Sequence, residues 1–474
     1  MVQTISASGD GGLKGGMGTW PQMGNIMNNY LIINARIVNQ GTVVPGFVLV
    51  RGGIIRAVAP GKPGAETDLA EVVDAGGKYL IPGVIDDHVH FREPGLTHKA
   101  EIATESRAAV AGGVTSYMEM PNTSPPAVTI AELEKKFERA SEASLANYSF
   151  YLGAATGNIG ELGKLDPERH CGVKLFMGSS TGNMMVEKPE ALERVFAESP
   201  ALLAVHCEDD AIIRKNLELQ LKVFGDNIPV RMHPVIRSDE ACFRSSARAV
   251  ELAQKHHTRL HVLHVTTARE MDLFEKGTDY TKKRITGEAC VHHLWFHDAD
   301  YERKGTLIKW NPAIKTLHDR DSLLKGLLED RLDVIATDHA PHTIEEKQNK
   351  YSVAPSGGPM IQHSLVAMLE LVHRKKLTIE KVVEKMCHAP ARLFGIKERG
   401  FILPGYKADL VLVDTEHEWT VTRRGLYYKC GWSPLEGEVF HSRVTHTWVN
   451  GKLVFMDGMF NEMVRGERLG FIKS

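Results

Sequence analysis

Three features that would place the chain in a specialised class are absent. The sequence has only six cysteines in 474 residues, and no two of them form a Cys-x-x-Cys pair. This spacing favours reduced and mostly buried thiols, Cys207 among them, as in a cytosolic protein. No stretch approaches the roughly 18 uninterrupted apolar residues of a membrane span. The formal net charge is only −2, which gives no electrostatic case for binding nucleic acid or an acidic membrane surface.

The two ends of the chain share a composition that the middle lacks. Short β-rich runs separated by Gly and Pro begin at Tyr30, and similar runs return near the end in ADLVLVD, EWTV and HTWVNGKLVF. We expect residues 29–78 and 400–460 to form one small β-sandwich domain built from both chain ends. The Gly-rich, aperiodic residues 1–28 predict a disordered leader, and residues 461–474 predict a C-terminal tail.

Residues 79–399 alternate apolar, strand-like segments with amphipathic, helix-like segments. The strand candidates are YLIPGVID, VTSYMEM, YSFYLGA, GVKLFMG, LLAVHC, RLHVLHV, RITGEAC and LDVIATD. Eight such alternations favour a TIM-like (β/α)₈ barrel, of class α/β, over an open doubly wound sheet. In such barrels the reacting groups lie at the C-terminal ends of the strands.

Residues with metal-ligand chemistry recur at the ends of these predicted strands. His88 and His90 close the first strand, His206 the fifth, His264 the sixth and Asp338 the eighth. Any one of them alone has a plainer explanation, either a hydrogen-bonded rim histidine or a helix-capping aspartate. Their recurrence at strand ends favours a metal site instead, because neutral imidazoles and carboxylates suit Zn²⁺ or a similar ion.

Lys174 lies inside the fourth predicted strand, GVKLFMG. A buried lysine is costly unless it is paired or chemically changed, and it loses its proton more readily than a free one. The neutral amine can take up CO₂ to form a carbamate, whose two oxygens can each hold a metal ion. The alternative is an ion pair across the barrel with an acidic side chain. We favour the carbamate, because four histidines and one aspartate leave two metals short of a bridging anion.

From Tyr30 to the 450s, these features resemble the amidohydrolase superfamily of (β/α)₈ metal hydrolases, and within it the dihydroorotases. The resemblance implies two Zn²⁺ ions per subunit, or another divalent metal, with a hydroxide and the CO₂-derived carbamate of Lys174 between them. The implied ligands are His88, His90 and Asp338 for one ion and His206 and His264 for the other. Asp86, two residues before His88, is a weaker candidate to support these ligands.

Four further residues match the dihydroorotase site for a ring that carries a carboxylate. Arg92 supplies a planar bidentate donor, Asn122 a further hydrogen bond, and His342 can reach the same anion. Asn311 resembles the family's Asn-Pro element near the ring, although a simple turn explains it equally well. The alternative for Arg92 is a surface ion pair with Glu93, but its position on the strand face of the metal histidines argues against that.

The resemblance therefore implies reversible cyclisation of N-carbamoyl-L-aspartate to L-dihydroorotate in de novo pyrimidine biosynthesis. Asp338 would act as general acid and base for the metal-bridged hydroxide. The alternatives are an allantoinase or dihydropyrimidinase-type cyclic amidase, or a non-catalytic amidohydrolase-like assembly protein. We expect a cytoplasmic homodimer without nucleic-acid or membrane partners, and association with aspartate transcarbamoylase stays open. Residues 178–186 and 343–358 are candidate lid loops, and we interpret His293 as structural.

Overall fold

The computed structural model describes residues 29–64, 70–178, 184–186 and 188–472. The predicted leader, residues 1–28, lies outside the described residues, as does most of the candidate lid 178–186. Within the described ranges, no helix combines the length and apolar character needed to cross a membrane.

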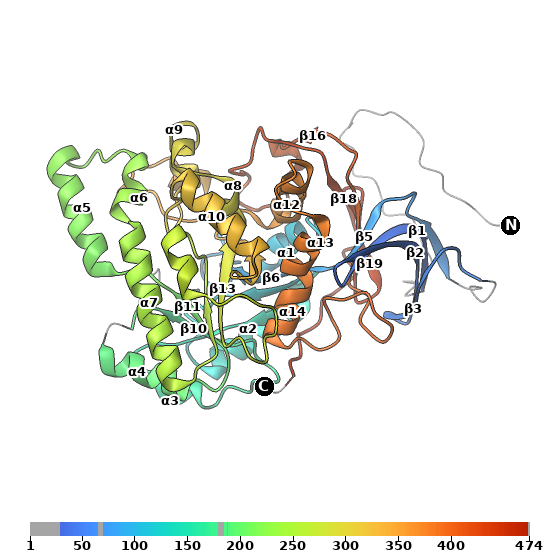
Figure 1. Cartoon of the computed structure of the whole chain (residues 1–474), viewed down its shortest axis with the longest axis horizontal. Coiled ribbons are helices and arrows are strands. Elements are labelled where there is room, and N and C mark those ends of the chain that lie inside the picture. The colour runs from blue at the N-terminus through green and yellow to red at the C-terminus, as the bar shows by residue number, and fades with distance from the viewer. Residues whose placement is uncertain (1–28, 65–69, 179–183, 187, 473–474) are drawn as a thin grey trace.

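The middle of the chain forms a barrel of parallel strands surrounded by helices, on the left of Figure 1. Each of the predicted strand segments forms in the described residues, and the third is interrupted at Tyr151. The barrel strands are β6 (Val84–Val89), β7 (Val114–Glu119), β8 (Asn147–Phe150), β9 (Leu152–Gly153), β10 (Val173–Phe176), β11 (Leu203–His206), β12 (Leu260–Val262), β13 (Ile285–Cys290) and β14 (Val334–Ala336). The barrel closes where the His90 N–H donates to the His339 carbonyl at 2.7 Å. This confirms the predicted fold class.

Helices cover the outside of the barrel and fill the connections between its strands. They are α1 (Ile102–Ala111), α2 (Ile130–Ala143), α3 (Ile159–Leu162), α4 (Pro189–Glu198), α5 (Asp210–Phe224), α6 (His233–Ile236), α7 (Asp239–His256), α8 (Val291–Trp295), α9 (Tyr301–Lys304), α10 (Leu317–Leu328), α11 (Ile344–Lys347), α12 (Ser364–His373), α13 (Ile379–Val383) and α14 (Ala389–Phe394). Helix α2 shows how the local sequence fixes where a helix begins. The Thr129 side chain accepts a hydrogen bond from the Glu132 N–H and caps the first turn. Leu133, Phe137 and Ala140, spaced at helical intervals, are its buried apolar face.

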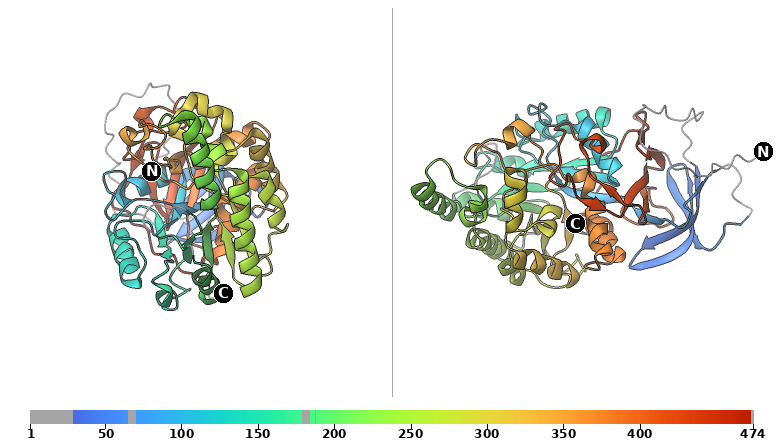
Figure 2. Two further views of the ribbon diagram at one scale, coloured as in Figure 1. Left: turned by 90° about the vertical axis from the view of Figure 1, so that its left-hand side faces the viewer. Right: turned by 90° about the horizontal axis from the view of Figure 1, so that it is seen from above.

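The two chain ends meet in one continuous sheet beside the barrel, on the right of Figure 1 and of the right-hand view in Figure 2. Its nine strands in the described residues are β1 (Tyr30–Asn39), β2 (Thr42–Arg51), β3 (Ile54–Pro60), β4 (Glu71–Asp74), β5 (Tyr79–Pro82), β15 (Leu410–Asp414), β18 (Arg443–Val449), β19 (Lys452–Met456) and β20 (Met459–Phe460). Strand β5 joins the halves, because it pairs with β1 on one side and β15 on the other. The short strands β16 (Trp419–Thr420) and β17 (Val439–Phe440) form a separate pair.

The first predicted strand, 79–86, is divided at Gly83 between the two parts of the molecule. Residues before Gly83 belong to β5 in the end sheet, and residues after it belong to β6 in the barrel. A Cβ atom at Gly83 would lie 2.0 Å from the Thr115 hydroxyl, so only glycine fits at this crossing. The Gly83 N–H also donates to the Asp409 carbonyl at 2.8 Å. The strand that carries His88 and His90 is therefore anchored directly to the end sheet.

Candidate active site

All ten residues that the sequence analysis singled out line one cavity of about 150 Å³ at the C-terminal ends of the barrel strands. They are His88, His90, Arg92, Asn122, Lys174, His206, His264, Asn311, Asp338 and His342. Phe176, Trp310, Ala340 and the segment Pro355–Gly357 complete the lining. The cavity thus lies where a barrel of this kind places its chemistry.

His88, His90 and Asp338 converge at one end of the cavity. Asp338 Oδ1 lies 3.3 Å from His88 Nε2 and 3.1 Å from His90 Nε2. The three residues offer ligand atoms that all lie within 4.8 Å of one another. Burial alone would raise the pKa of Asp338, but the two histidines outweigh it and hold that pKa well below its usual range. A carboxylate and two imidazoles in this arrangement can hold a divalent cation.

The other nitrogen of each of these two imidazoles is held by a neighbouring side chain. His88 Nδ1 lies 3.0 Å from Glu288 Oε1, and His90 Nδ1 lies 2.7 Å from Asn122 Oδ1. The Nδ1 atom of each ring is thus held by an oxygen, and both Nε2 atoms face Asp338 Oδ1. Asp86 plays a different part from the one expected of it, because it accepts the backbone N–H of His88 rather than contacting the ring.

His206 and His264 form a second pair of imidazoles beside the first. His206 Nδ1 lies 2.9 Å from His264 Nε2, and the centroid of the His264 ring is 5.3 Å from that of His88. Burial, followed by the charges of neighbouring histidines, holds the pKa of His264 well below its usual value, so its ring is neutral. His264 Nδ1 is buried and has no hydrogen-bond partner among the described residues. Two neutral imidazoles at this distance can both act as ligands of one metal ion.

Lys174 projects from β10 into the same cavity and is 1% exposed. Its amine lies 4.5 Å from the centroid of the Phe176 ring, and within the described ranges no carboxylate approaches it to 4.0 Å. The predicted alternative, an ion pair across the barrel, is therefore not formed in this part of the chain. Burial lowers the pKa of Lys174 to about 7, which favours the neutral amine.

Arg92, His342 and Asn311 form a further group in the lining of the cavity. The Arg92 Nε–H donates to the Pro341 carbonyl at 3.0 Å, and its terminal nitrogen lies 3.1 Å from His342 Nε2. Lys99 Nζ lies 3.0 Å from His342 Nδ1, and the Ser356 carbonyl lies 3.0 Å from His342 Nε2. Asn311 Oδ1 is buried without a hydrogen-bond partner among the described residues. Arg92 and Lys99 thus bring hydrogen-bond donors and positive charge to the side chain of His342.

Glu288 and Lys99 are among the residues of the site that the sequence analysis missed. Glu288 lies in β13, fully buried, and holds His88, and Lys99 brings a second cation to His342. The argument that singled out Lys174, a charged side chain inside an apolar strand, applies equally to Glu288 and would have found it. Lys99 gives no comparable signal, because it lies in an irregular segment. His293, interpreted as structural, lies near the Pro312 carbonyl at 3.1 Å and does not line the cavity.

The donor set fits the metal ions that the resemblance implies. Nitrogen and oxygen donors converge from two neighbouring groups of residues, and two of the imidazoles are oriented by partners on their far nitrogens. The buried nitrogen of His264 and the buried amine of Lys174 have no protein partner that would compete for them in the described ranges.

Comparison with known proteins agrees with this geometry. A sequence model of the amidohydrolase family matches residues 79–454. A dihydroorotase of Anaplasma phagocytophilum is 34% identical over 92% of this chain and 98% of its own, and one of Methanosarcina mazei is 32% identical over 91% and 95%. The L-hydantoinase (dihydropyrimidinase) of Arthrobacter aurescens superposes with a TM-score of 0.85 at 25% identity, covering 91% of this chain and 97% of its own. The protein therefore belongs to the amidohydrolase family.

Proposed function

We propose that this protein is a dihydroorotase, which interconverts L-dihydroorotate and N-carbamoyl-L-aspartate. The relatives from Anaplasma phagocytophilum and Methanosarcina mazei, together with one from Thermococcus kodakarensis at 30% identity, support this assignment, because all three are named dihydroorotase and match over nearly their full length. The convergence of several polar side chains on one cavity further supports a small-molecule substrate.

The observation that carries the proposal is that the Arg92 side chain is buried without a nearby carboxylate in the described residues. Its side chain is buried in the cavity wall, and in the described part of the chain no carboxylate lies within 4.0 Å of its guanidinium. Burial lowers its pKa to about 10, a sign that the charge is poorly compensated. A buried cation without an anionic partner favours a substrate that brings one. Dihydroorotate has a ring carboxylate, whereas dihydrouracil and allantoin do not.

The proposed metal site consists of His88, His90 and Asp338 for one ion and His206 and His264 for the other, with Lys174 as a carbamate between them. Two bound divalent ions, zinc in our proposal, would lower the pKa of a shared water and polarise the ring amide carbonyl. The isolation of the Lys174 amine from carboxylates supports the carbamate, because an ion-paired lysine would not be free to react with CO₂.

The side chains of the cavity have separate tasks in this proposal. Arg92, His342 and Asn122 hold the ring carboxylate, and Asn311 Oδ1, which is otherwise without a partner in the described residues, accepts a ring N–H. This fixes the amide bond beside Asp338. Asp338 takes a proton from the attacking water and returns it to the ring nitrogen as the carbon–nitrogen bond breaks. In the reverse direction it first takes the proton of the ureido nitrogen.

A second candidate is a hydantoinase or dihydropyrimidinase, which the fold similarity to the Arthrobacter aurescens enzyme favours. These enzymes, like allantoinases, act on cyclic amides without a ring carboxylate. Arg92 argues against this candidate, because an uncharged ring would leave its guanidinium uncompensated.

Replacing Arg92 by alanine tests the assignment. We expect Arg92→Ala to raise the KM for L-dihydroorotate by about 10- to 100-fold, the value of a charge-assisted hydrogen-bond pair. Metal content should stay at the wild-type level, since Arg92 is not in the ligand set. Steady-state kinetics of the metal-loaded enzyme measure KM, and metal content is measured on the same preparation. Arg214→Ala, on the exposed side of α5, is the control. An unchanged KM in Arg92→Ala would remove the carboxylate-binding role and with it the substrate assignment.

We also propose, from the resemblance to dihydroorotases alone, that the protein acts as a homodimer in the cytoplasm. Association with aspartate transcarbamoylase stays a prediction on the same basis. Sedimentation equilibrium of the purified chain tests the dimer directly.

A further inference from the structure

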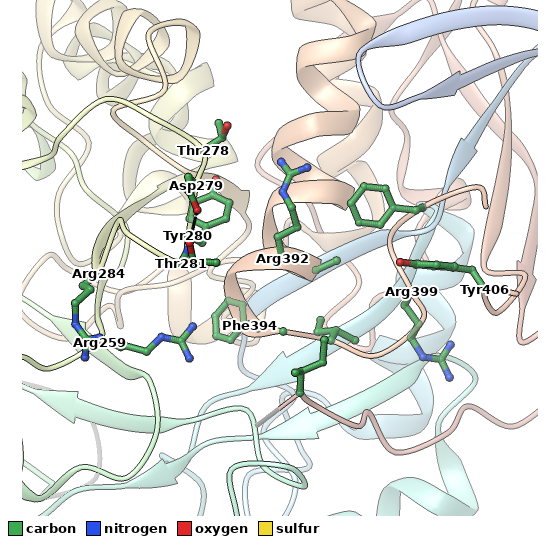
Figure 3. A pocket seen from close by; sticks show the side chains of 15 residues that line it. Arg259, Thr278, Asp279, Tyr280, Thr281, Arg284, Arg392, Phe394, Arg399 and Tyr406 are labelled. Atoms are coloured by element: carbon green, nitrogen blue, oxygen red, sulfur yellow. Dashed lines mark hydrogen bonds between the residues drawn. The ribbon is translucent and has the colours of Figure 1, made fainter. Parts of the chain in front are cut away.

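A second cavity, of about 610 Å³, opens at the end of the barrel opposite the candidate active site (Figure 3). Arg259 directly precedes β12 and Arg284 directly precedes β13, so both lie at the N-terminal ends of barrel strands, whereas the candidate active site lies at the C-terminal ends. The facing wall comes from α14 and the segment that follows it, including Arg392 and Arg399. The volume of this cavity is within the range of small-molecule sites.

The four arginines of this cavity differ in how their charges are compensated. Arg392 forms an ion pair with Glu384, and Arg399 pairs with Asp409 and with Glu467. Arg259 and Arg284 instead donate to backbone carbonyls, those of Leu393 and His257. In the described part of the chain, no carboxylate lies within 4.0 Å of either guanidinium. Two cations of this cavity therefore lack an anionic partner there.

Arg259 and Arg284 are also neighbours. Strands β12 and β13 are parallel with Leu260 opposite Ile285, so the residues just before them lie side by side. Figure 3 shows both at one side of the cavity, with Arg399 at the other. Burial first, and the charge of Arg284 second, lower the pKa of Arg259. Like charges at adjacent strand positions are unfavourable unless an anion bridges them.

Aromatic side chains line the space between these arginines and the opposite wall. Tyr280, Phe394, Phe401 and Tyr406 all contribute, and the Tyr280 hydroxyl is buried without a hydrogen-bond partner among the described residues. Aromatic faces stack on planar rings, whereas paired guanidiniums match the oxygens of a phosphate. The cavity combines both chemistries.

We propose that this cavity binds a phosphorylated small molecule with a planar ring, of the nucleoside monophosphate class. Arg259 and Arg284 hold the phosphate, and the ring lies against Tyr280 and Phe394. The site is separate from the candidate active site, because the two lie at opposite ends of the barrel strands. It is independent of which cyclic amide the enzyme hydrolyses.

Titration calorimetry of the metal-loaded enzyme with adenosine monophosphate, adenosine and inorganic phosphate tests the proposal. We expect adenosine monophosphate to bind more tightly than either of its parts, and more weakly as salt rises. Arg284→Gln should weaken this binding at least about tenfold, as loss of a charge-assisted contact does. Arg259→Gln serves as a second variant with the same expected loss. Arg214→Gln on α5 should bind normally, and all three variants should keep the wild-type hydrolysis rate.

Three results would overturn the proposal. One is no binding of adenosine monophosphate at about 1 mM, the weak end of specific affinities. Another is equal affinity in wild type and in both arginine variants. The third is loss of binding in Arg92→Ala with retention in Arg284→Gln, which would assign the nucleotide to the candidate active site.

Discussion

At the scale of single residues, three members of the candidate site have backbones in the left-handed region. The φ angles are 69° for Arg92, 38° for His264 and 44° for Asp338, and none of the three is glycine. Such conformations cost about 1–3 kcal/mol each and persist only where the surroundings hold them. Glu288 holds one of them, since its Oε1 accepts the His264 N–H at 2.8 Å. The surroundings of the ligand candidates thus matter as much as the ligands.

Glu288 should control metal affinity through His88. Glu288→Ala removes the acceptor for His88 Nδ1 and for the His264 N–H, so we expect metal affinity to fall about 10- to 100-fold. Glu288→Gln keeps an acceptor oxygen and should restore part of that loss. Competition with a chelator of known affinity measures the effect. Glu270→Gln is the control, because that buried carboxylate contacts Ser246 and Thr267 and not the site. Equal metal affinity in Glu288→Ala and wild type would contradict the positioning role.

Lys174 gives a prediction that depends on CO₂. If its amine is carboxylated, apoenzyme freed of CO₂ should regain activity with zinc only slowly, and added bicarbonate should accelerate the recovery. Lys174→Ala should show no bicarbonate effect. Activity measured against time after zinc addition checks this. Rapid, complete recovery of the wild type in CO₂-free buffer would exclude the carbamate.

At the scale of elements, the segment 343–358 is held in place by two buried lysines. The Lys347 amine donates to the carbonyls of Lys309, Pro355 and Gly357 at 3.2, 2.8 and 2.7 Å. The Lys309 amine donates to the carbonyls of Tyr351 and Ala354. Because Pro355–Gly357 line the candidate active site, these contacts shape it. The described contacts fit a wall better than a freely moving lid.

Lys347→Met should therefore affect both stability and substrate binding. Three buried carbonyls lose a donor, so we expect a loss of about 3 kcal/mol in unfolding free energy and a several-fold rise in KM. Denaturant unfolding and steady-state kinetics measure the two effects. Lys381→Met, which breaks an ion pair with Asp330 away from the cavity, should change stability without changing KM. A normal KM in Lys347→Met would show that substrate binding does not depend on the hydrogen bonds that Lys347 donates to this segment.

Strands and strand ends were predictable because periodicity and chemistry are local properties of the sequence. The barrel strands and the six metal-ligand candidates follow from such signals, whereas Arg92, Asn122, Asn311 and His342 came from the resemblance to dihydroorotases. Contacts across the barrel were not predictable, because nothing local indicates that Glu288 meets a histidine 200 positions earlier. The division of 79–86 at Gly83 was also missed, because its cause is the distant Thr115 side chain. Asp86 was placed on the correct strand, but its contact with the His88 backbone could not be predicted. The Asp86 carboxylate also accepts the hydroxyl of Thr337, which directly follows β14 and is distant in sequence.

At the scale of the whole molecule, a buried polar network joins the end sheet to the barrel. Asn147 in β8 donates to Asp409 at 3.1 Å, and Asn450 donates to Asn147 at 2.8 Å. Arg399 pairs with Asp409, and the Asn450 N–H donates to the same carboxylate at 2.7 Å. We retain as a proposal the division into a barrel, residues 79–399, and a part built from both ends, except that Tyr79–Pro82 belong to the end sheet. The polar network links the two parts.

Loss of the Asp409 carboxylate should destabilise the barrel and the end sheet together. Asp409→Ala leaves Arg399 and two amides without their buried acceptor, which costs about 3–5 kcal/mol. We expect one cooperative unfolding transition at lower denaturant in both tryptophan fluorescence and circular dichroism. Asp414→Ala, at the partly buried C-terminal end of β15, is the control. Two separate transitions in the wild type would contradict the coupling.

The central claim is that the cavity hydrolyses a cyclic amide that carries a carboxylate, with metal ions. The most direct test is turnover of L-dihydroorotate by zinc-loaded enzyme, measured beside allantoin and dihydrouracil and repeated after chelation. We expect turnover of dihydroorotate alone, lost on chelation and restored by zinc. Turnover of an uncharged ring in preference to dihydroorotate, or turnover that survives complete metal removal, would contradict the account.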